Sequence, residues 1–145
     1  MADRPPNTGL RVYTWEEFDA DARKIADTIK ARGLTFRWIY GPPRGGMPLA
    51  IRLSHLLLPD NQRTGSENNK FVFTPVLPNY AMLPSYNKYF LIVDDIADTG
   101  KTLSHYYVKG FFIATLFKHP QSVVTPDIWI REKDDRWVQF PWEAP

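Results

Sequence analysis

The 145-residue chain contains no cysteine. This absence excludes a disulfide-stabilised scaffold and any chemistry that needs a thiolate. No segment approaches the roughly eighteen consecutive apolar residues of a membrane-spanning helix. The segment Met1–Leu10 is polar and contains prolines, unlike a signal peptide. We therefore expect a cytoplasmic protein without a membrane span.

A strong excess of charge of one sign is also missing. Eighteen basic side chains stand against sixteen acidic ones, which leaves a net charge of +2. Binding to duplex nucleic acid calls for a clustered basic face. The charge balance therefore predicts no nucleic-acid partner.

The composition is that of an ordinary globular protein, with 43% hydrophobic and 23% charged residues. A chain of this length can bury the core of one compact domain. It shows no internal repeat and no clear domain boundary. We expect a single domain over residues 1–145, in which 13 prolines indicate much non-repetitive backbone.

Helical and strand-like segments alternate along the chain. Thr14 and Glu17 form a capping-box pattern at the start of a helix, and Gly33 is a stop signal. Further helices are expected over residues 48–58 and 101–108, and strands over residues 36–40, 71–76, 89–93 and 111–117. Residues 1–12 are expected to form an extended arm, residues 60–70 a polar loop, and residues 123–142 short strands with turns. Strands separated by helices predict an α/β fold, with ligands at the carboxyl ends of parallel strands.

The most informative segment is Val93–Thr102, with the sequence VDDIADTGKT. We expect an apolar strand to end at Val93 and a loop over Asp94–Gly100 to lead into a helix. Backbone N–H groups at such a helix start suit a phosphate. Two adjacent carboxylates would repel a phosphate alone, whereas the vicinal hydroxyls of a ribose can donate to them and hydrated Mg²⁺ can offset the charge. The segment therefore predicts a site for a ribose with a 5′-phosphate.

Two simpler interpretations apply to parts of this segment. The acidic residues on their own could form a solvated turn, and the residues after them could merely cap the helix. A nucleotide-binding P-loop is excluded, because its pattern G-x-x-x-x-G-K-[ST] needs glycine where this chain has Asp95.

The segment VDDIADTGKT resembles the signature of type I phosphoribosyltransferases that binds 5-phosphoribosyl 1-diphosphate (PRPP). Other segments resemble the bacterial xanthine-guanine branch, which acts on 6-oxopurines, and they occur in the same order. They are Trp15–Ala26, the loop Arg44–Gly46, Phe117–Pro120 (resembling Phe-x-Lys-Pro) and Asp135–Glu143. The resemblance implies a parallel sheet flanked by helices, with a small hood formed partly by the C-terminal segment.

The resemblance implies a role for each matched residue on the PRPP side. Asp94 and Asp95 would bind the ribose hydroxyls, with Asp95 also near Mg²⁺, the implied cofactor. Arg44 and Gly45 would meet the pyrophosphate, and a non-proline cis peptide is expected between Pro43 and Arg44. The 5′-phosphate would lie in a cradle of Thr99, Gly100, Lys101 and Thr102, and Asp98 is a further PRPP-binding residue of the same segment.

On the base side, Asp98 would act in proton transfer near the purine N7. Lys118 would be the second catalytic residue and would read the base, because an ammonium group only donates and so favours O6 over an amino group. Taken alone, Lys118 would more often be a surface lysine at a strand end, and only the ordered set of matches favours the base-reading role. Trp137 would stack on the purine, the Val138 carbonyl would contact the edge with the 2-substituent, and Glu143 is a further candidate near the metal.

These features predict a purine salvage enzyme that transfers the 5-phosphoribosyl group of PRPP to a 6-oxopurine (guanine, xanthine or hypoxanthine) and releases pyrophosphate. We also expect it to form a homo-oligomer. One rival is a non-catalytic PRPP-binding regulator, which would not need Lys118 or Trp137. Another is transfer to a pyrimidine or another heterocycle, against which the C-terminal resemblance argues. The helix after Gly46 is shorter than in the family pattern, and residues 58–88 have no clear match to the family's flexible catalytic loop.

Overall fold

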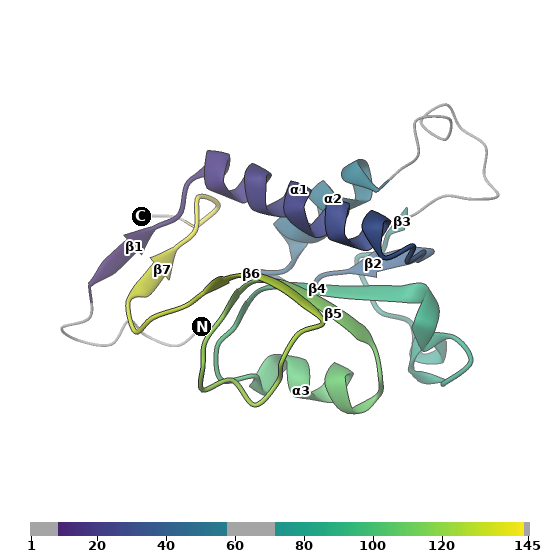
Figure 1. Cartoon of the computed structure of the whole chain (residues 1–145). Helices are drawn as coiled ribbons and strands as arrows, with labels where there is room; N and C mark the ends of the chain where they lie inside the picture. Colours follow the sequence, from purple (N-terminus) through teal and green to yellow (C-terminus); the bar gives the residue numbers. More distant parts are fainter. Residues whose placement is uncertain (1–8, 58–71, 144–145) are drawn as a thin grey trace.

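A computed structural model of the protein describes residues 9–57 and 72–143. A five-stranded sheet in the order β3-β2-β4-β5-β6 forms its centre, and every pair of neighbouring strands is parallel. The strands are β2 (Trp38–Tyr40), β3 (Val72–Phe73), β4 (Phe90–Ala97), β5 (Phe112–Lys118) and β6 (Ile128–Glu132). Helices α1 (Trp15–Ala31) and α2 (Met47–Leu56) cover one face, and α3 (Lys101–Val108) covers the other (Figure 1). The predicted α/β class is confirmed.

The first half of the central strand β4, residues 90–93, is buried on both faces, as its apolar sequence FLIV requires. Leu91 and Val93 belong to the core cluster that includes α1 and α2. Phe90 and Ile92 belong to the cluster on the α3 side. Alternate residues of one strand therefore supply both cores.

Helix α1 begins and ends as its local signals indicate. The Glu17 N–H donates to Thr14 Oγ1 at 3.1 Å, and the Thr14 N–H donates to Glu17 Oε2 at 3.0 Å, which confirms the capping box. Gly33 follows the helix with φ of 66°, a left-handed conformation that suits glycine. The apolar positions of the helix are buried at Phe18, Ala22, Ile25, Ala26 and Ile29.

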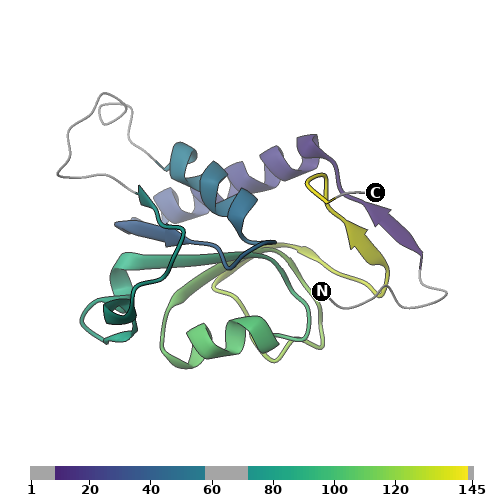
Figure 2. The ribbon, with the colours of Figure 1, turned by 180° about the vertical axis from the view of Figure 1, so that it is seen from behind.

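A second, smaller sheet consists of β1 (Leu10–Val12) and β7 (Trp137–Gln139), which pair in parallel. It lies beside one end of the main sheet in both views (Figures 1 and 2). The ring of Phe140 contacts the rings of Tyr13 and Phe117 edge-on, at centroid distances of 5.5 and 5.9 Å. This two-stranded sheet corresponds to the hood, and its first strand lies within the segment that was predicted only as an extended arm.

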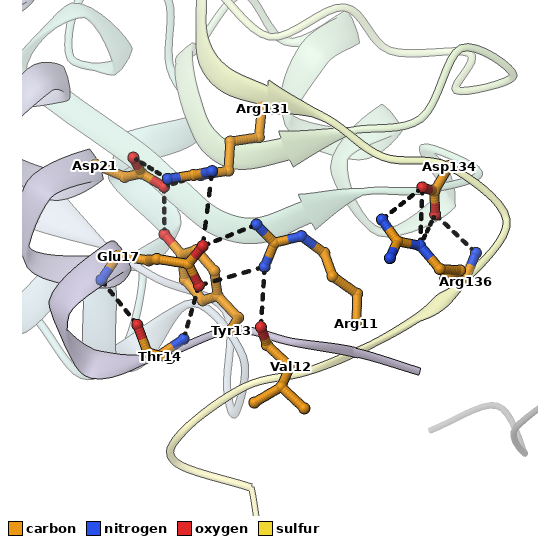
Figure 3. A network of polar contacts seen from close by, with 9 residues as sticks. All are labelled: Arg11, Val12, Tyr13, Thr14, Glu17, Asp21, Arg131, Asp134 and Arg136. Atoms are coloured by element: carbon orange, nitrogen blue, oxygen red, sulfur yellow. Dashed lines mark hydrogen bonds and ion pairs between the residues drawn. The ribbon is translucent and has the colours of Figure 1, made fainter. Parts of the chain in front are cut away.

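A buried ionic network connects the hood strand, α1 and β6 (Figure 3). Asp21 on α1 is fully buried, and its Oδ2 accepts hydrogen bonds from the Tyr13 hydroxyl and from Arg131 Nε, both at 2.6 Å. Glu17 extends the network by accepting from Arg11 at 3.0 Å. Arg131, which is 110 residues away from Asp21 in the sequence, is therefore joined to α1 and to Tyr13 at one carboxylate.

One structural prediction was wrong at the site itself. The loop expected from Asp94 does not begin there, because β4 continues to Ala97. Its backbone remains paired with β5 as far as the register Ala97↔Lys118. Only Asp98–Gly100 separate the strand from α3. The two carboxylates therefore lie on a strand.

Other bounds differ from prediction by small amounts. The strand expected over residues 36–40 begins at Trp38, the one over 71–76 shrinks to Val72–Phe73, and the one over 111–117 shifts by one residue. The second helix begins at Met47 and ends at Leu56, whereas α3 occupies its predicted residues. Residues 79–82 and 87–89 form short 3₁₀ helices. The polar loop over 60–70 lies outside the described residues, as does much of the region in which a flexible catalytic loop was expected.

Candidate functional site

The strand order places a topological switch point at the carboxyl ends of β2 and β4. After β2 the chain passes through α2 to β3 on one side, whereas β4 pairs with β2 on the other side. Helices α2 and α3, which follow β2 and β4, cover opposite faces of the sheet. Ligands of open α/β sheets bind at such a switch point. The loop Gly41–Gly46 and the turn Asp98–Gly100 therefore both lie at the edge of the sheet where a ligand is expected.

The paired carboxylates lie at this edge in a desolvated environment. Asp94 is only 7% exposed, and its Oδ1 accepts a hydrogen bond from the Asp95 N–H at 2.9 Å. Burial raises the pKa of Asp94 well above its ordinary value, and the charge of Asp95 raises it further. Burial also raises the pKa of Asp95, against the opposing effect of hydrogen bonds with Asp94 and the Ile96 N–H. In the ligand-free protein this pair therefore resists carrying two negative charges.

The loop after β2 packs directly on these carboxylates. A Cβ atom added to Gly45 would lie within contact distance of all three terminal atoms of Asp95, with Cγ at 2.8 Å. Added to Gly46, it would lie 2.6 Å from the Val93 carbonyl oxygen. The peptide between Pro43 and Arg44 is cis, as expected, and the Arg44 side chain is exposed. Close approach to β4 accounts for glycine at both positions.

We therefore expect Gly45→Ala to displace the Asp95 carboxylate and to weaken PRPP binding at least tenfold. Titration calorimetry with PRPP and Mg²⁺ would measure this effect. Gly9→Ala is the matched control, because a Cβ there would meet only the flexible Arg136 side chain at 3.4 Å. Equal PRPP affinity in the two variants would contradict this role of Gly45.

The turn after β4 combines a left-handed glycine with exposed side chains. Gly100 has φ of 87°, and a Cβ there would lie 2.8 Å from the Val124 nitrogen. The Thr99 carbonyl accepts from the Val123 N–H at 3.0 Å, which fixes the turn against the neighbouring loop. Asp98, Thr99, Lys101 and Thr102 are all exposed around the first turn of α3. N–H groups at such a position suit a phosphate.

Lys118 is the last residue of β5 and pairs in register with Ala97 of β4, so it lies beside the turn that begins at Asp98. Its ammonium lies 5.7 Å from the ring centroid of Trp129. In the motif Phe-x-Lys-Pro the lysine directly precedes proline, but this chain has His119 before Pro120. The buried His119 ring contacts Asp135 through Nε2 at 3.0 Å and accepts from the Gln121 N–H at 3.1 Å.

The structure places Trp137 and Val138 in the hood, apart from the sheet that carries the acidic segment. The Trp137 N–H donates to the Gly9 carbonyl, and the Gln139 carbonyl accepts from the Tyr13 N–H. In a parallel pair of strands, successive residues direct their backbone N–H and C=O groups to opposite sides. Val138 lies between Trp137 and Gln139, so its backbone groups are directed away from β1. The Val138 carbonyl therefore points away from β1, while its side chain is buried in the core.

Glu143 comes close enough to the acidic pair to be influenced by it. Burial raises the pKa of Glu143, and the negative charge of Asp95 adds to this effect. Within the described residues, no group of three or more His, Asp or Glu side chains is arranged to hold a metal ion. A cation at Asp95 would therefore need oxygen ligands from a bound molecule or from water.

One further basic residue lies at this edge and was not predicted from the sequence. Lys133, directly after β6, places its ammonium 3.8 Å from Asp98 Oδ1, and its backbone N–H donates to the Lys118 carbonyl at 2.8 Å. No local motif marks Lys133, because its proximity to Asp98 depends on the pairing of β5 with β6. In the described part of the chain, no helix is both long and apolar enough to cross a membrane.

Comparison with known proteins agrees with this geometry. The family model described as "Phosphoribosyl transferase domain" matches residues 10–145. The xanthine-guanine phosphoribosyltransferase of Gluconobacter oxydans (strain 621H) is 31% identical over 151 residues, which span 97% of this chain and 88% of that protein. The protein of the same name from Cereibacter sphaeroides (strain ATCC 17025 / ATH 2.4.3) is 30% identical over 155 residues, with coverages of 99% and 92%.

The structural comparison gives the same answer for the fold. The crystal structure of a purine phosphoribosyltransferase from Pyrococcus horikoshii Ot3 matches with a TM-score of 0.69 at 27% identity, covering 93% of this chain and 94% of that one. The type I phosphoribosyltransferase fold expected from the resemblance is thereby confirmed. With 136 of its 145 residues within the family model (10 to 145), the chain belongs to the phosphoribosyl transferase family.

Proposed function

We propose that this protein transfers the 5-phosphoribosyl group of PRPP to a 6-oxopurine (guanine, xanthine or hypoxanthine) and releases pyrophosphate. The observation that carries the proposal is the pair of adjacent carboxylates on β4, the buried Asp94 and the partly buried Asp95, for both of which burial raises the pKa. Ribose hydroxyls can donate hydrogen bonds to such carboxylates. The proposal gains support from two similar proteins that are both named xanthine-guanine phosphoribosyltransferase.

On the PRPP side, Asp94 and Asp95 bind the ribose hydroxyls. The 5′-phosphate lies at the N-terminus of α3, where backbone N–H groups and the helix dipole favour an anion. Thr99, Gly100, Lys101 and Thr102 form this cradle. The exposed guanidinium of Arg44 and the backbone of Gly45 meet the pyrophosphate, for which the planar arginine fork is suited.

The donor set of the site fits Mg²⁺. Asp95 offers a carboxylate at the point where the Gly45 loop approaches, and Mg²⁺ commonly uses one or two carboxylates together with substrate phosphates and water. We therefore assign the metal to Asp95, with Glu143 as a nearby acidic group. When bound, the metal offsets the charge of the departing pyrophosphate.

On the base side, Asp98 accepts the proton from N7 while N9 attacks C1′ of the ribose. Lys118 and the Val138 carbonyl bind the base, and Trp137 stacks on it. These residues hold the base in line with the departing pyrophosphate, which removes much of the entropic barrier. The active unit is a single domain over residues 1–145 that assembles as a homo-oligomer and acts in the cytoplasm.

A panel of bases tests this function directly. With PRPP and Mg²⁺, we expect the protein to turn over at least one of guanine, xanthine and hypoxanthine, and to use adenine at least about 10³-fold less efficiently. A site built around a polar contact rejects a mismatched partner strongly. Pyrophosphate release measures turnover, and excess chelator is the negative control. If the protein binds PRPP but turns over none of these purines, a PRPP-binding regulator or another base class replaces this proposal.

A further inference from the structure

Lys133 lies at the functional edge of the sheet although it belongs to no recognised motif. It directly follows β6, and its N–H donates to the carbonyl of Lys118, the last residue of β5, at 2.8 Å. In the same sheet Lys118 pairs with Ala97, one residue before Asp98. Backbone pairing across three strands therefore brings Lys133 next to the turn after β4.

The side chain of Lys133 is directed into this edge and away from solvent. It is only 11% exposed, although lysine is rarely buried unless it is paired. Its ammonium lies 3.8 Å from Asp98 Oδ1 and donates to the Asp134 carbonyl at 3.1 Å. The distance to Asp98 exceeds that of a hydrogen bond, so at least one of the three N–H donors has no acceptor among the described residues.

The other basic groups near the end of β5 have different neighbours. The ammonium of Lys118 lies over Trp129, and the ring of His119 contacts Asp135 and the Gln121 N–H. Within the part of the chain that the structure describes, Lys133 is the basic side chain at ion-pair distance from Asp98. Asp98 and Lys133 thus present an acceptor and a donor side by side.

That arrangement complements one particular edge of a purine. Guanine carries O6 and N7 on adjacent positions of the same edge, whereas adenine carries an amino group in place of O6. The carboxylate of Asp98 can accept a proton from N7 while the ammonium of Lys133 donates to O6. Against adenine, the same ammonium would face a second donor.

We propose that Lys133 is a specificity-determining residue that binds O6 of the base beside Asp98, in addition to Lys118. This inference rests on the proposed function, since it assigns the contact that selects the substrate class. It places one of the base-reading groups on the segment after β6, which the sequence motifs do not cover.

Nucleotide binding tests the contact without relying on turnover. Inosine 5′-monophosphate carries O6, and purine riboside 5′-monophosphate is the same molecule without a 6-substituent. Lys133→Met keeps the hydrocarbon stem and removes the charge. By calorimetry we expect this variant to lose 10- to 100-fold in affinity for inosine 5′-monophosphate, the range for a hydrogen bond to a charged group, and less than threefold for the other nucleotide. Lys133→Arg should recover part of the loss.

Two controls separate recognition from folding. Lys24→Met removes an exposed lysine of α1 and should leave both affinities unchanged. PRPP affinity of Lys133→Met should match that of wild type, because Lys133 is assigned to the base. The variant Lys118→Met, measured in the same way, shows how much of the affinity for inosine 5′-monophosphate depends on Lys118.

Each alternative result has a defined meaning. Unchanged affinity of Lys133→Met for inosine 5′-monophosphate would overturn the inference and leave Lys118 as the reader of O6. An equal loss for both nucleotides would overturn it as well, because Lys133 would then only support the fold of the site. If the wild-type protein binds neither nucleotide, and if none of the purines supports consumption of PRPP, the proposed function itself fails. The role of Lys133 then fails with it.

Discussion

Replacing Asp94 and Asp95 together by asparagine is expected to abolish tight PRPP binding and to stabilise the ligand-free protein. The loss of binding follows from removing both acceptors of the ribose hydroxyls and the carboxylate assigned to Mg²⁺. Hydrogen bonds to charged groups contribute about 1.5–3 kcal/mol each, so the affinity should fall roughly 10²-fold or more. Calorimetry with PRPP and Mg²⁺ measures this loss.

The gain in stability follows from the raised pKa values of both carboxyls. Burial and mutual repulsion make the ionised pair less favourable in the folded protein than in the unfolded chain. At a pH below the unfolded carboxyl pKa of about 4, the side chains are protonated in both states and the substitution changes little. As pH rises above this value, the wild type loses stability up to the raised folded pKa, and the variant does not. Near neutral pH we expect a gain of roughly 0.5–2 kcal/mol, in the range of stabilising substitutions.

Thermal unfolding of both proteins in chelator from pH 3 to pH 8 would check this gain. The difference in Tm between variant and wild type should be near zero in acid and should grow with pH. Asparagine keeps an oxygen for the Asp95 N–H, so the local backbone hydrogen bond can persist. A variant that binds PRPP as wild type does would refute the assignment of the site. A variant that is less stable at neutral pH would show that the pair has a structural role instead.

Asp21→Ala is expected to destabilise the protein by about 3–5 kcal/mol, the range for removing one partner of a buried ion pair. Asp21 is 0% exposed, and its loss would leave the Tyr13 hydroxyl and the Arg131 guanidinium without their shared acceptor. Burial raises the pKa of Tyr13, and the hydrogen bond to Asp21 adds to the effect, so the hydroxyl remains a donor across the physiological range. Tm should fall by roughly 10–20 °C, which thermal unfolding would measure.

Asp19→Ala provides a matched comparison on the same helix. The Asp19 side chain is 43% exposed, although it pairs with Arg23 at 2.9 Å and with Arg52 at 2.8 Å. Exposed pairs contribute about 0–1 kcal/mol, so this variant should remain close to wild type. Asp21→Asn keeps a hydrogen-bond acceptor without the charge, so its Tm should lie between those of the two alanine variants. If both alanine variants unfold at the same temperature, the buried network does not hold the hood to the sheet.

The sequence alone determined the features that depend on neighbouring residues. The capping box at Thr14 and the bounds of α3 follow from local patterns, and so does the turn at Asp98–Thr102 that we propose as the phosphate site. Capping hydrogen bonds form within a few residues, and helical periodicity is set by spacing along the chain. The segment VDDIADTGKT indicated the proposed ligand side of the sheet for the same reason.

Only the tertiary structure decided the features that depend on distant partners. The strand β4 extends through Asp94 and Asp95 because β5 supplies its hydrogen-bonding partners, and the pattern of acidic residues gives no sign of this. The hood joins Leu10 to Trp137, and Asp21 meets Arg131 although 110 residues separate them. Lys133 reaches Asp98 through the register of three strands. Strand pairing and buried ion pairs acquire their energy from burial in the assembled fold, so local sequence cannot specify them.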